Sequence, residues 1–262
     1  MSDSDPCRLC GAKTQRLFSL VVLESHQIAY LECAGCGSLQ TESPYWLKEA
    51  YEHNLAVLDT GAAQRNLANQ AASFAIARLL GLRDVLDFGG GDGLLCRLLR
   101  DCGVNCYVND KYAPPSYAIA YTRPDFARPS LLLAFEVFEH FANPSSELKD
   151  VFESGAEAIL ASTVAYDGEG SDWWYLTPES GQHVFFYSRS AMGSIARTYG
   201  YELVTQGNYW LFARRERFGA TTRLVARLLL TGAMRRIVGA TLRLMPSPGV
   251  TRDFDSLRSH SK

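Results

Sequence analysis

The sequence predicts an α/β fold in which a doubly wound, mostly parallel sheet carries a C-terminal antiparallel hairpin and follows a small N-terminal module. First, short apolar runs alternate with helical patterns across the middle of the chain, as such sheets require. Second, a glycine-rich loop follows one apolar run and opens a helix. Third, two cysteine motifs lie near the N-terminus. We therefore divide the chain into residues 1–42, 43–214 and 215–262.

The elements of the middle segment follow from local patterns. A helix is predicted over Gly61–Leu80, where apolar residues recur at near-helical spacing, and Gly81 suits its C-terminal cap. A second helix is predicted over Leu94–Asp101. The predicted strands are the short apolar runs Asp84–Phe88, Asn105–Asn109, Leu131–Phe135, Ala158–Ser162, Val184–Tyr187, Tyr201–Thr205 and Trp210–Ala213. The last two form a hairpin across Gly207-Asn208.

The composition limits the class of protein. The 262 residues are 47% hydrophobic, ordinary for a globular protein, and the net charge of −2 gives the whole molecule no strong signature of polyanion binding. The sequence has no secretory leader and no apolar run of about 18 residues, so we expect a cytoplasmic protein. In a reducing compartment, the seven cysteines favour metal binding or buried thiols over disulfides.

The glycine-rich loop, VLDFGGGDG at Val85–Gly93, is the strongest indication of a ligand site. Gly89, Gly91 and Gly93 allow backbone conformations and a close ligand approach that a Cβ would block. A phosphate loop would need a Gly-Lys-Ser/Thr sequence, which is absent. The dinucleotide fingerprint needs a glycine at its sixth position. That position is Leu94 if the count starts at Gly89 and Cys96 if it starts at Gly91. The spacing therefore excludes both of these nucleotide motifs.

The charge of the loop favours a cationic ligand. Asp87 at the strand end and Asp92 within the loop would repel a pyrophosphate, whereas they would attract an ammonium and a sulfonium group. S-adenosylmethionine carries both groups. Asp110, at the end of the next strand, can accept hydrogen bonds from ribose hydroxyls. The alternative is a glycine-rich connection that binds nothing.

Three motifs resemble the class I S-adenosylmethionine-dependent methyltransferases. The glycine loop matches their first motif, acid-x-Gly-x-Gly-x-Gly, and LLLAFEVFEHFANP at Leu131–Pro144 resembles their fourth-strand motif. Trp174–Ser188 resembles a loop of a subgroup found with polysaccharide- or sugar-modifying genes. The resemblance spans residues 50–214 and implies a Rossmann-like fold. One departure is the short interval from Asp110 to Leu131, which leaves little room for the third strand. The acid that contacts adenine is then Asp125, or it is missing.

The N-terminal cysteines form two Cys-x-x-Cys-Gly motifs, and strand-like runs lie between them. This pattern predicts a zinc ribbon in which four thiolates hold a structural Zn²⁺. The predicted ligands are Cys7, Cys10, Cys33 and Cys36. Four buried thiols or an iron–sulfur cluster remain as alternatives. The sugar C-methyltransferases that the chain resembles also begin with a paired-cysteine module.

The candidate catalytic residues follow the predicted strands. Glu139 and His140 come after Leu131–Phe135, and His183 lies in the loop after Ala158–Ser162. A histidine suits removal of a proton from a hydroxyl or from a sugar carbon beside a keto group. Glu136, just past the same strand, is predicted to contact the cofactor. As alternatives, His140 could cap the following helix and His183 could be a structural hydrogen-bonding residue.

Two further features bear on the acceptor. Trp173, Trp174 and Tyr175 could form a lid that packs on the core or a platform for a sugar ring. The C-terminal tail from Arg214 has eleven basic and three acidic residues, a balance of +8 that leaves −10 for the rest. Within it, Thr221–Met245 reads as a basic amphipathic helix. Such a helix could lie on an anionic membrane or dock on the core.

The predicted function is therefore methyl transfer from S-adenosylmethionine to a sugar or sugar-linked small molecule, by C- or O-methylation. One alternative is an RNA methyltransferase that reads RNA with the ribbon. However, Met1–Thr41 contains only three basic residues against four acidic ones, so we expect no nucleic-acid partner. The other alternative is a non-catalytic binding module that retains the cofactor fold. Peripheral membrane contact through the basic tail stays open.

Overall fold

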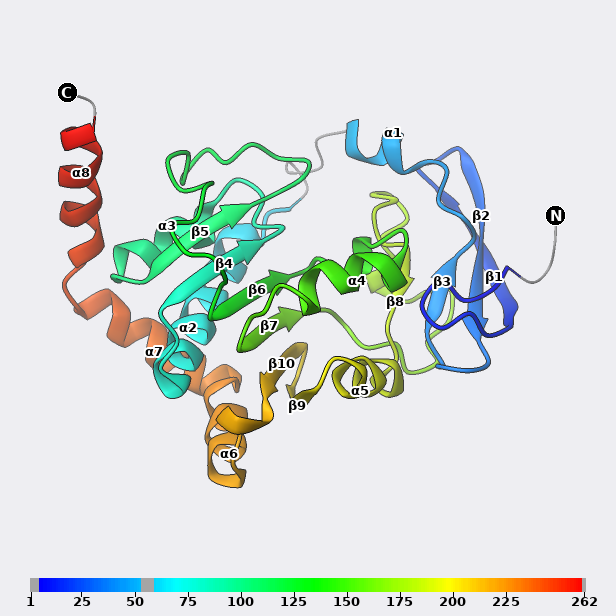
Figure 1. Cartoon of the computed structure of the whole chain (residues 1–262). Helices are drawn as coiled ribbons and strands as arrows, with labels where there is room; N and C mark the ends of the chain where they lie inside the picture. Colours follow the sequence, from blue (N-terminus) through cyan, green and yellow to red (C-terminus); the bar gives the residue numbers. More distant parts are fainter. Residues whose placement is uncertain (1–4, 53–58, 261–262) are drawn as a thin grey trace. The chain divides into compact units, whose positions relative to one another are not determined.

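The computed structural model describes residues 5–52 and 59–260, and its contacts divide the chain into two compact units (Figure 1). We call Thr60–Phe135, Ser154–Ala161 and Glu202–Lys262 the sheet unit. Met1–Asp59, Glu136–Glu153 and Ser162–Tyr201 make up the ribbon unit. The ribbon unit thus gathers stretches that lie far apart in the sequence. The boundaries at residues 42 and 214 stay predictions.

The sheet unit is built on six strands in the order β5-β4-β6-β7-β10-β9. These strands are β4 (Asp84–Phe88), β5 (Asn105–Asn109), β6 (Leu131–Phe135), β7 (Ala158–Ser162), β9 (Tyr201–Gln206) and β10 (Tyr209–Arg214). The strand β4 pairs in parallel with β5 on one side and with β6 on the other. The order agrees with a doubly wound sheet, with β9 and β10 as neighbouring strands around a short turn. The predicted fold class is confirmed.

The interval after β5 contains no strand within the described residues, so β5 lies at the edge of the sheet. Residues 110–130 instead form bends and turns. Asp125, one candidate for the adenine-contacting acid, accepts a hydrogen bond from the Asn105 side chain at 3.1 Å. The missing third strand is therefore a feature of this chain.

The helices of the sheet unit are α2 (Ala62–Leu80), α3 (Leu94–Asp101), α6 (Ala220–Leu229), α7 (Gly232–Leu244) and α8 (Pro248–His260). Gly81 ends α2 in the left-handed conformation, as predicted. The prediction of one helix over Thr221–Met245 is wrong, because the segment forms two helices: α6 ends at Leu229 and α7 begins at Gly232. There Thr231 caps α7 by accepting a hydrogen bond from the Met234 amide.

The basic tail packs within the sheet unit. Both α6 and α7 contact α2, and Ala226 and Leu230 are buried in the core. The helix α8 contacts α3, where Asp253 accepts hydrogen bonds from Arg100 at 2.7 and 2.9 Å and from Arg97 at 2.9 Å. The inner side of these helices therefore docks on the core of the sheet unit. No helix in the described part of the chain is long and apolar enough to cross a bilayer.

The ribbon unit contains a four-stranded antiparallel sheet in the order β1-β2-β3-β8. The strands are β1 (Thr14–Val22), β2 (His26–Cys33), β3 (Leu39–Thr41) and β8 (Phe185–Phe186). The helices are α1 (Leu47–Glu52), α4 (Pro144–Phe152) and α5 (Arg189–Thr198), with short 3₁₀ turns η2 (Phe138–His140) and η3 (Trp174–Leu176). The predicted strand Val184–Tyr187 is shorter than expected. It pairs with β3, because Leu39 and Phe186 lie opposite each other there.

Candidate functional site

The glycine loop leads from β4 into α3 in the sheet unit. The Gly89 amide donates to the Asn109 carbonyl at 2.8 Å, which ties the loop to the end of β5. Gly91 has a φ of +55°, a conformation that favours glycine, and a Cβ there would meet no atom within 4 Å. A Cβ at Gly90 would instead approach the Asp87 carboxylate within 2.4 Å. The loop is therefore packed tightly on one side and open on the other.

Asp87 lies beneath this loop and is only 2% exposed. Its Oδ2 atom is buried without a hydrogen-bond partner. Burial, and then the nearby Asp110 and Asp92 carboxylates, raise the pKa of Asp87 to about 7. A buried carboxylate oxygen that lacks a partner is costly unless a cation or a donor satisfies it. The arrangement thus favours a positively charged ligand.

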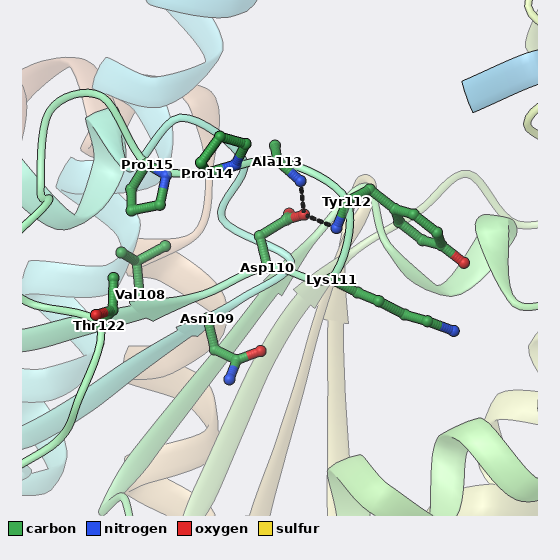
Figure 2. Close-up of a pocket in the computed structure, with 9 residues that line it drawn as sticks. All are labelled: Val108, Asn109, Asp110, Lys111, Tyr112, Ala113, Pro114, Pro115 and Thr122. Carbon is green, nitrogen blue, oxygen red and sulfur yellow. Dashed lines mark hydrogen bonds between the residues drawn. The ribbon is translucent and has the colours of Figure 1, made fainter. Parts of the chain in front are cut away.

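Asp110 holds the glycine loop to the end of β5. Its Oδ2 accepts from the Gly91 amide at 2.9 Å, and its Oδ1 accepts from the Tyr112 and Ala113 amides at 2.7 Å each. Figure 2 shows the two bonds to Tyr112 and Ala113. Each carboxylate oxygen has two lone pairs, so Asp110 keeps one acceptor position, on Oδ2, for a ribose hydroxyl.

A pocket of about 260 Å³ lies at the end of β5, beside Asp110 (Figure 2). It is lined by Val108, Asn109, Asp110, Lys111, Tyr112, Ala113, Pro114, Pro115 and Thr122. In this fold, ligands bind at the carboxyl ends of the strands. The sequence analysis found Asp110 but missed the rest of the lining. The signal was available, because most of these residues directly follow Asp110 in the chain.

A second cluster of polar residues lies in the ribbon unit, around Glu136. This glutamate directly follows β6 and has a φ of +52°, which is uncommon for a residue with a side chain. Its amide donates to the Ser162 carbonyl at 3.0 Å, and the Ser162 hydroxyl donates to its Oε1 at 2.5 Å. The Tyr175 hydroxyl lies 3.0 Å from its Oε2. These bonds hold Glu136 in its strained conformation.

Glu139 is fully buried beside Tyr175. Its Oε1 lies 2.5 Å from the Tyr175 hydroxyl, and its Oε2 has no hydrogen-bond partner. Burial, and then the Glu136 charge, raise the pKa of Glu139 well above its ordinary value. Burial and the neighbouring charge therefore favour the protonated form of Glu139. Since the Tyr175 hydroxyl has one proton, it can donate to Glu136 and accept from the protonated Glu139.

His140 and His183 lie next to Glu139. Their ring centroids are 5.0 Å apart, and the ring planes are almost perpendicular, at 86°. His183 Nδ1 lies 2.7 Å from the Tyr175 carbonyl oxygen. A carbonyl only accepts, so Nδ1 carries the proton and the lone pair lies on Nε2. His140 Nδ1 lies 3.3 Å from the Tyr51 hydroxyl.

Both histidines are neutral near pH 7. Burial, and then the charge of His183, lower the pKa of His140 to about 3. Burial also lowers the pKa of His183. His140 belongs to η2, and α4 begins later, after Asn143, without a side-chain cap. The alternative that His140 caps this helix is therefore wrong.

The structure brings together three residues that the sequence placed on two separate loops. Glu139, His140 and His183 each offer a donor atom, and these atoms lie within 4.8 Å of one another. The sequence analysis missed the roles of Tyr51 and Ser162 as hydrogen-bond partners, and it treated Tyr175 only as an aromatic side chain. Nothing in the local sequence pattern of Tyr51 and Ser162 distinguishes them.

The four N-terminal cysteines gather at one point of the ribbon unit. Their sulfur atoms lie within 4.8 Å of one another, with Cys10 and Cys33 at 3.5 Å and Cys7 and Cys36 at 3.8 Å. The amides of Gly35 and Cys36 each point at the Cys33 sulfur from 3.3 Å. A set of four thiolates with amide donors matches a closed tetrahedral metal site.

Comparisons with known proteins give similar solved structures and one family model. Similar solved structures include magnesium protoporphyrin IX methyltransferase from Synechocystis PCC 6803, 13% identical over 64% of this chain and 92% of that chain, with a TM-score of 0.44. The mitomycin 7-O-methyltransferase MmcR is 13% identical over 64% of this chain and 60% of its own, with a TM-score of 0.45. No curated protein matches. A family model described as a methyltransferase domain matches residues 49–206, more than half of the chain. The chain therefore belongs to the methyltransferase domain family, as predicted.

Proposed function

We propose that the protein transfers a methyl group from S-adenosylmethionine to a small-molecule acceptor. The observation that carries this proposal is the buried, unpartnered Oδ2 of Asp87 beneath an open glycine loop. The ammonium group of the cofactor would satisfy this oxygen, and Asp110 with its pocket suits the ribose and the adjoining part of the nucleoside. When bound, the cofactor supplies a methyl group on a positively charged sulfur.

The residues proposed to hold the cofactor are Asp87, Gly89, Gly91, Gly93, Asp110 and Glu136. The first five belong to the glycine loop and the end of β5. Glu136 is included because it directly follows β6 in the chain, the usual location of ligand contacts in this fold. Calorimetry tests this set, since an absence of S-adenosylmethionine binding would defeat the proposal.

For the acceptor, we propose that His183 removes a proton and that His140 and Glu139 support it. Nε2 of His183 has a free lone pair because Nδ1–H is held by the Tyr175 carbonyl. This bond fixes both the tautomer and the orientation of the ring, as a general base requires. The proton would come from a hydroxyl or from a carbon beside a keto group.

The proposed acceptor is a sugar or a sugar-linked molecule. The resemblance of residues 174–188 to sugar-modifying methyltransferases supports this class, and Trp174 is 70% exposed in that segment. An exposed indole face is a suitable surface for a sugar ring. A screen of nucleotide sugars and lipid-linked sugars with labelled cofactor tests the class. Transfer only to aromatic hydroxyls would contradict a sugar acceptor.

We further propose that Cys7, Cys10, Cys33 and Cys36 bind a structural Zn²⁺. The donor set supports this choice, because four thiolates leave no open position for a substrate or a water molecule. The metal would order the start of β1, which follows the first cysteine motif, and the end of β2, which carries Cys33. Metal analysis of the purified protein should give about one zinc per chain from this site.

We also propose that the outward side of α6 and α7 contacts the inner face of an anionic membrane. Leu224, Leu228, Ile237 and Leu244 are exposed there, with exposed fractions of 55–88%. Arg236 and Arg243 directly precede Ile237 and Leu244 in α7 and are themselves exposed. Exposed apolar side chains beside arginines suit a surface of negatively charged lipid headgroups.

Vesicle co-sedimentation tests this contact. The wild type should bind vesicles that contain phosphatidylglycerol and release them at high salt, whereas Arg236→Glu with Arg243→Glu should bind weakly. Arg83→Glu, which changes an exposed arginine outside the tail, is the matched control. Equal binding to neutral vesicles, or no effect of the double substitution, would contradict an electrostatic membrane contact.

A further inference from the structure

The cluster of Glu139, His140 and His183 has a feature that proton removal leaves unexplained. Glu139 is 0% exposed, yet its buried Oε2 atom has no hydrogen-bond partner. Leaving such an atom without a partner destabilises a folded protein, and more so if the atom is charged. A ligand that satisfies it would remove this cost. The neighbouring donor atoms indicate which ligand.

Each of the three side chains is held by an outer partner through one atom. The Tyr175 carbonyl accepts from His183 Nδ1, and the Tyr175 hydroxyl contacts Oε1 of Glu139. The Tyr51 hydroxyl contacts Nδ1 of His140. The remaining atoms are Nε2 of each histidine and Oε2 of Glu139. Metal-binding histidines and carboxylates are oriented in this way, with the second atom of each side chain bonded to an outer residue.

We propose that Glu139, His140 and His183 form a second metal site, distinct from the cysteine cluster, that binds a divalent cation of the Zn²⁺, Co²⁺ or Fe²⁺ type. Two imidazoles and one carboxylate suit these ions, and three protein ligands leave at least one open position. One donor atom from each residue lies within 4.8 Å of the others.

The electrostatic surroundings favour a cation here. The Glu136 carboxylate lies on the other side of the Tyr175 hydroxyl, 3.0 Å from it. His183 presents the lone pair of Nε2, because its Nδ1–H is bonded to the Tyr175 carbonyl, and an imidazole with a free lone pair is the form that binds a metal. Any proton on the Glu139 carboxylate would be released to solvent as the cation binds. The buried Glu139 carboxylate and the half-buried Glu136 carboxylate would then share a positive charge.

The consequence for catalysis rests on the proposed function. A cation on Nε2 of His183 and a proton on the same atom exclude each other, so the proposed base works only while this site is empty. Divalent cations should therefore inhibit methyl transfer. The cation site itself depends only on the three side chains, so its test does not require turnover.

The test uses the full chain with one equivalent of zinc already loaded, since the four thiolates are expected to fill first. Cobalt(II) is then titrated and followed by visible absorption. We expect one further equivalent to give d–d bands without the thiolate charge-transfer absorption of a cysteine site. A wild type that binds no second equivalent, or only one with thiolate absorption, overturns the proposal.

Two variants and a control locate the site. Glu139→Gln keeps an oxygen for Tyr175 but loses the charged ligand, and it should weaken cobalt binding by more than the roughly 10–100-fold typical of outer-residue changes. His140→Gln should do the same, and near-UV circular dichroism checks that each variant folds. The control His26→Gln removes a histidine that pairs with Glu49 at 2.9 Å elsewhere in the ribbon unit. Cobalt binding that survives both site variants, or that is lost in the control, overturns the assignment.

Turnover gives a separate result. If His183 is the base, turnover should fall with the same cobalt midpoint as the absorption change. A rise in turnover at that midpoint would keep the cation site and overturn His183 as the base. An absence of S-adenosylmethionine binding would overturn the proposed function without affecting the cobalt titration.

Discussion

Replacement of Asp87 by asparagine tests the cofactor site most directly. The substitution keeps the size of the side chain and an oxygen that can accept a hydrogen bond, but it removes the negative charge. Asp84→Asn is the matched control, because Asp84 begins the same strand. Its carboxylate accepts a hydrogen bond from the Asn105 side chain at 3.1 Å. A difference between the two variants therefore reports the charge at the loop end of β4.

The size of the effect follows from the pKa of Asp87. Burial, and then Asp110 and Asp92, raise this pKa from 3.8 to about 7, while a bound ammonium group requires the charged form. Below pH 7, the affinity for S-adenosylmethionine should fall about tenfold per pH unit, or about 1.4 kcal/mol, and roughly a hundredfold by pH 5. Asp87→Asn should bind weakly at every pH and lose this slope.

The same shift affects stability with the opposite sign. Because the folded state holds the proton more tightly than the unfolded state, the free energy of unfolding without cofactor should decrease as the pH rises from about 4 to 7. The full decrease is about 4 kcal/mol, on the order of three pKa units at 1.36 kcal/mol each. Asp87→Asn should therefore be more stable than the wild type at pH 8 and equal to it near pH 4.

Two measurements check this reasoning. Calorimetry from pH 5 to 7.5, in buffers with different ionisation enthalpies, gives both the affinity and the number of protons released when cofactor binds. Urea denaturation from about pH 4 to 8 gives the free energy of unfolding of the wild type and of Asp87→Asn. An affinity that is independent of pH in the wild type, or an Asp87→Asn variant that binds normally, would refute the charge pairing. Equal effects of Asp84→Asn would show that the strand charge in general, and not Asp87, is responsible.

Three further predictions concern other parts of the molecule. His183→Ala should lower turnover by about 10²–10⁴-fold while cofactor affinity survives, as steady-state kinetics with calorimetry can show; wild-type turnover would leave His183 with a structural role only. Cys33→Ser should reduce the zinc content of the protein and lower its melting temperature, and normal zinc content would contradict the ribbon site. Asp253→Asn should lower the free energy of unfolding at pH 7 by about 3 kcal/mol, because it leaves the buried Arg100 without its carboxylate partner. Although burial opposes it, the hydrogen bonds from Arg100 and Arg97 lower the pKa of Asp253 to about 2, so this loss should vanish as the pH falls from about 4 to 2 in urea titrations.

Much of the sheet unit could be predicted from the sequence. The bounds of β4, β5, β6 and β7 are those predicted, because each strand is a short apolar run that ends at polar or glycine residues. The glycine loop was equally accessible, since its spacing and its aspartates lie within nine consecutive residues. Signals of this kind are local, so one stretch of chain contains all of the information.

Other features depend on contacts between distant stretches. Phe185–Phe186 forms a strand because β3 offers it an edge, although its own sequence does not say which sheet it joins. The break between α6 and α7 combines a local cap at Thr231 with burial of Leu230 in the core, and only this burial depends on distant stretches. The local amphipathic pattern runs across this break without interruption.

By itself, the sequence determined the fold class, the family and the residues most worth examining: the acid and glycines of the loop, the four cysteines, and Glu139, His140 and His183. Only the tertiary structure decided how those residues interact. It buried Asp87 without a partner for Oδ2, placed Asp110 on the loop amides, and gathered two histidines and a glutamate around Tyr175. The reason is physical: burial and hydrogen-bond partners, which set charge and reactivity, come from segments that are far apart in the chain.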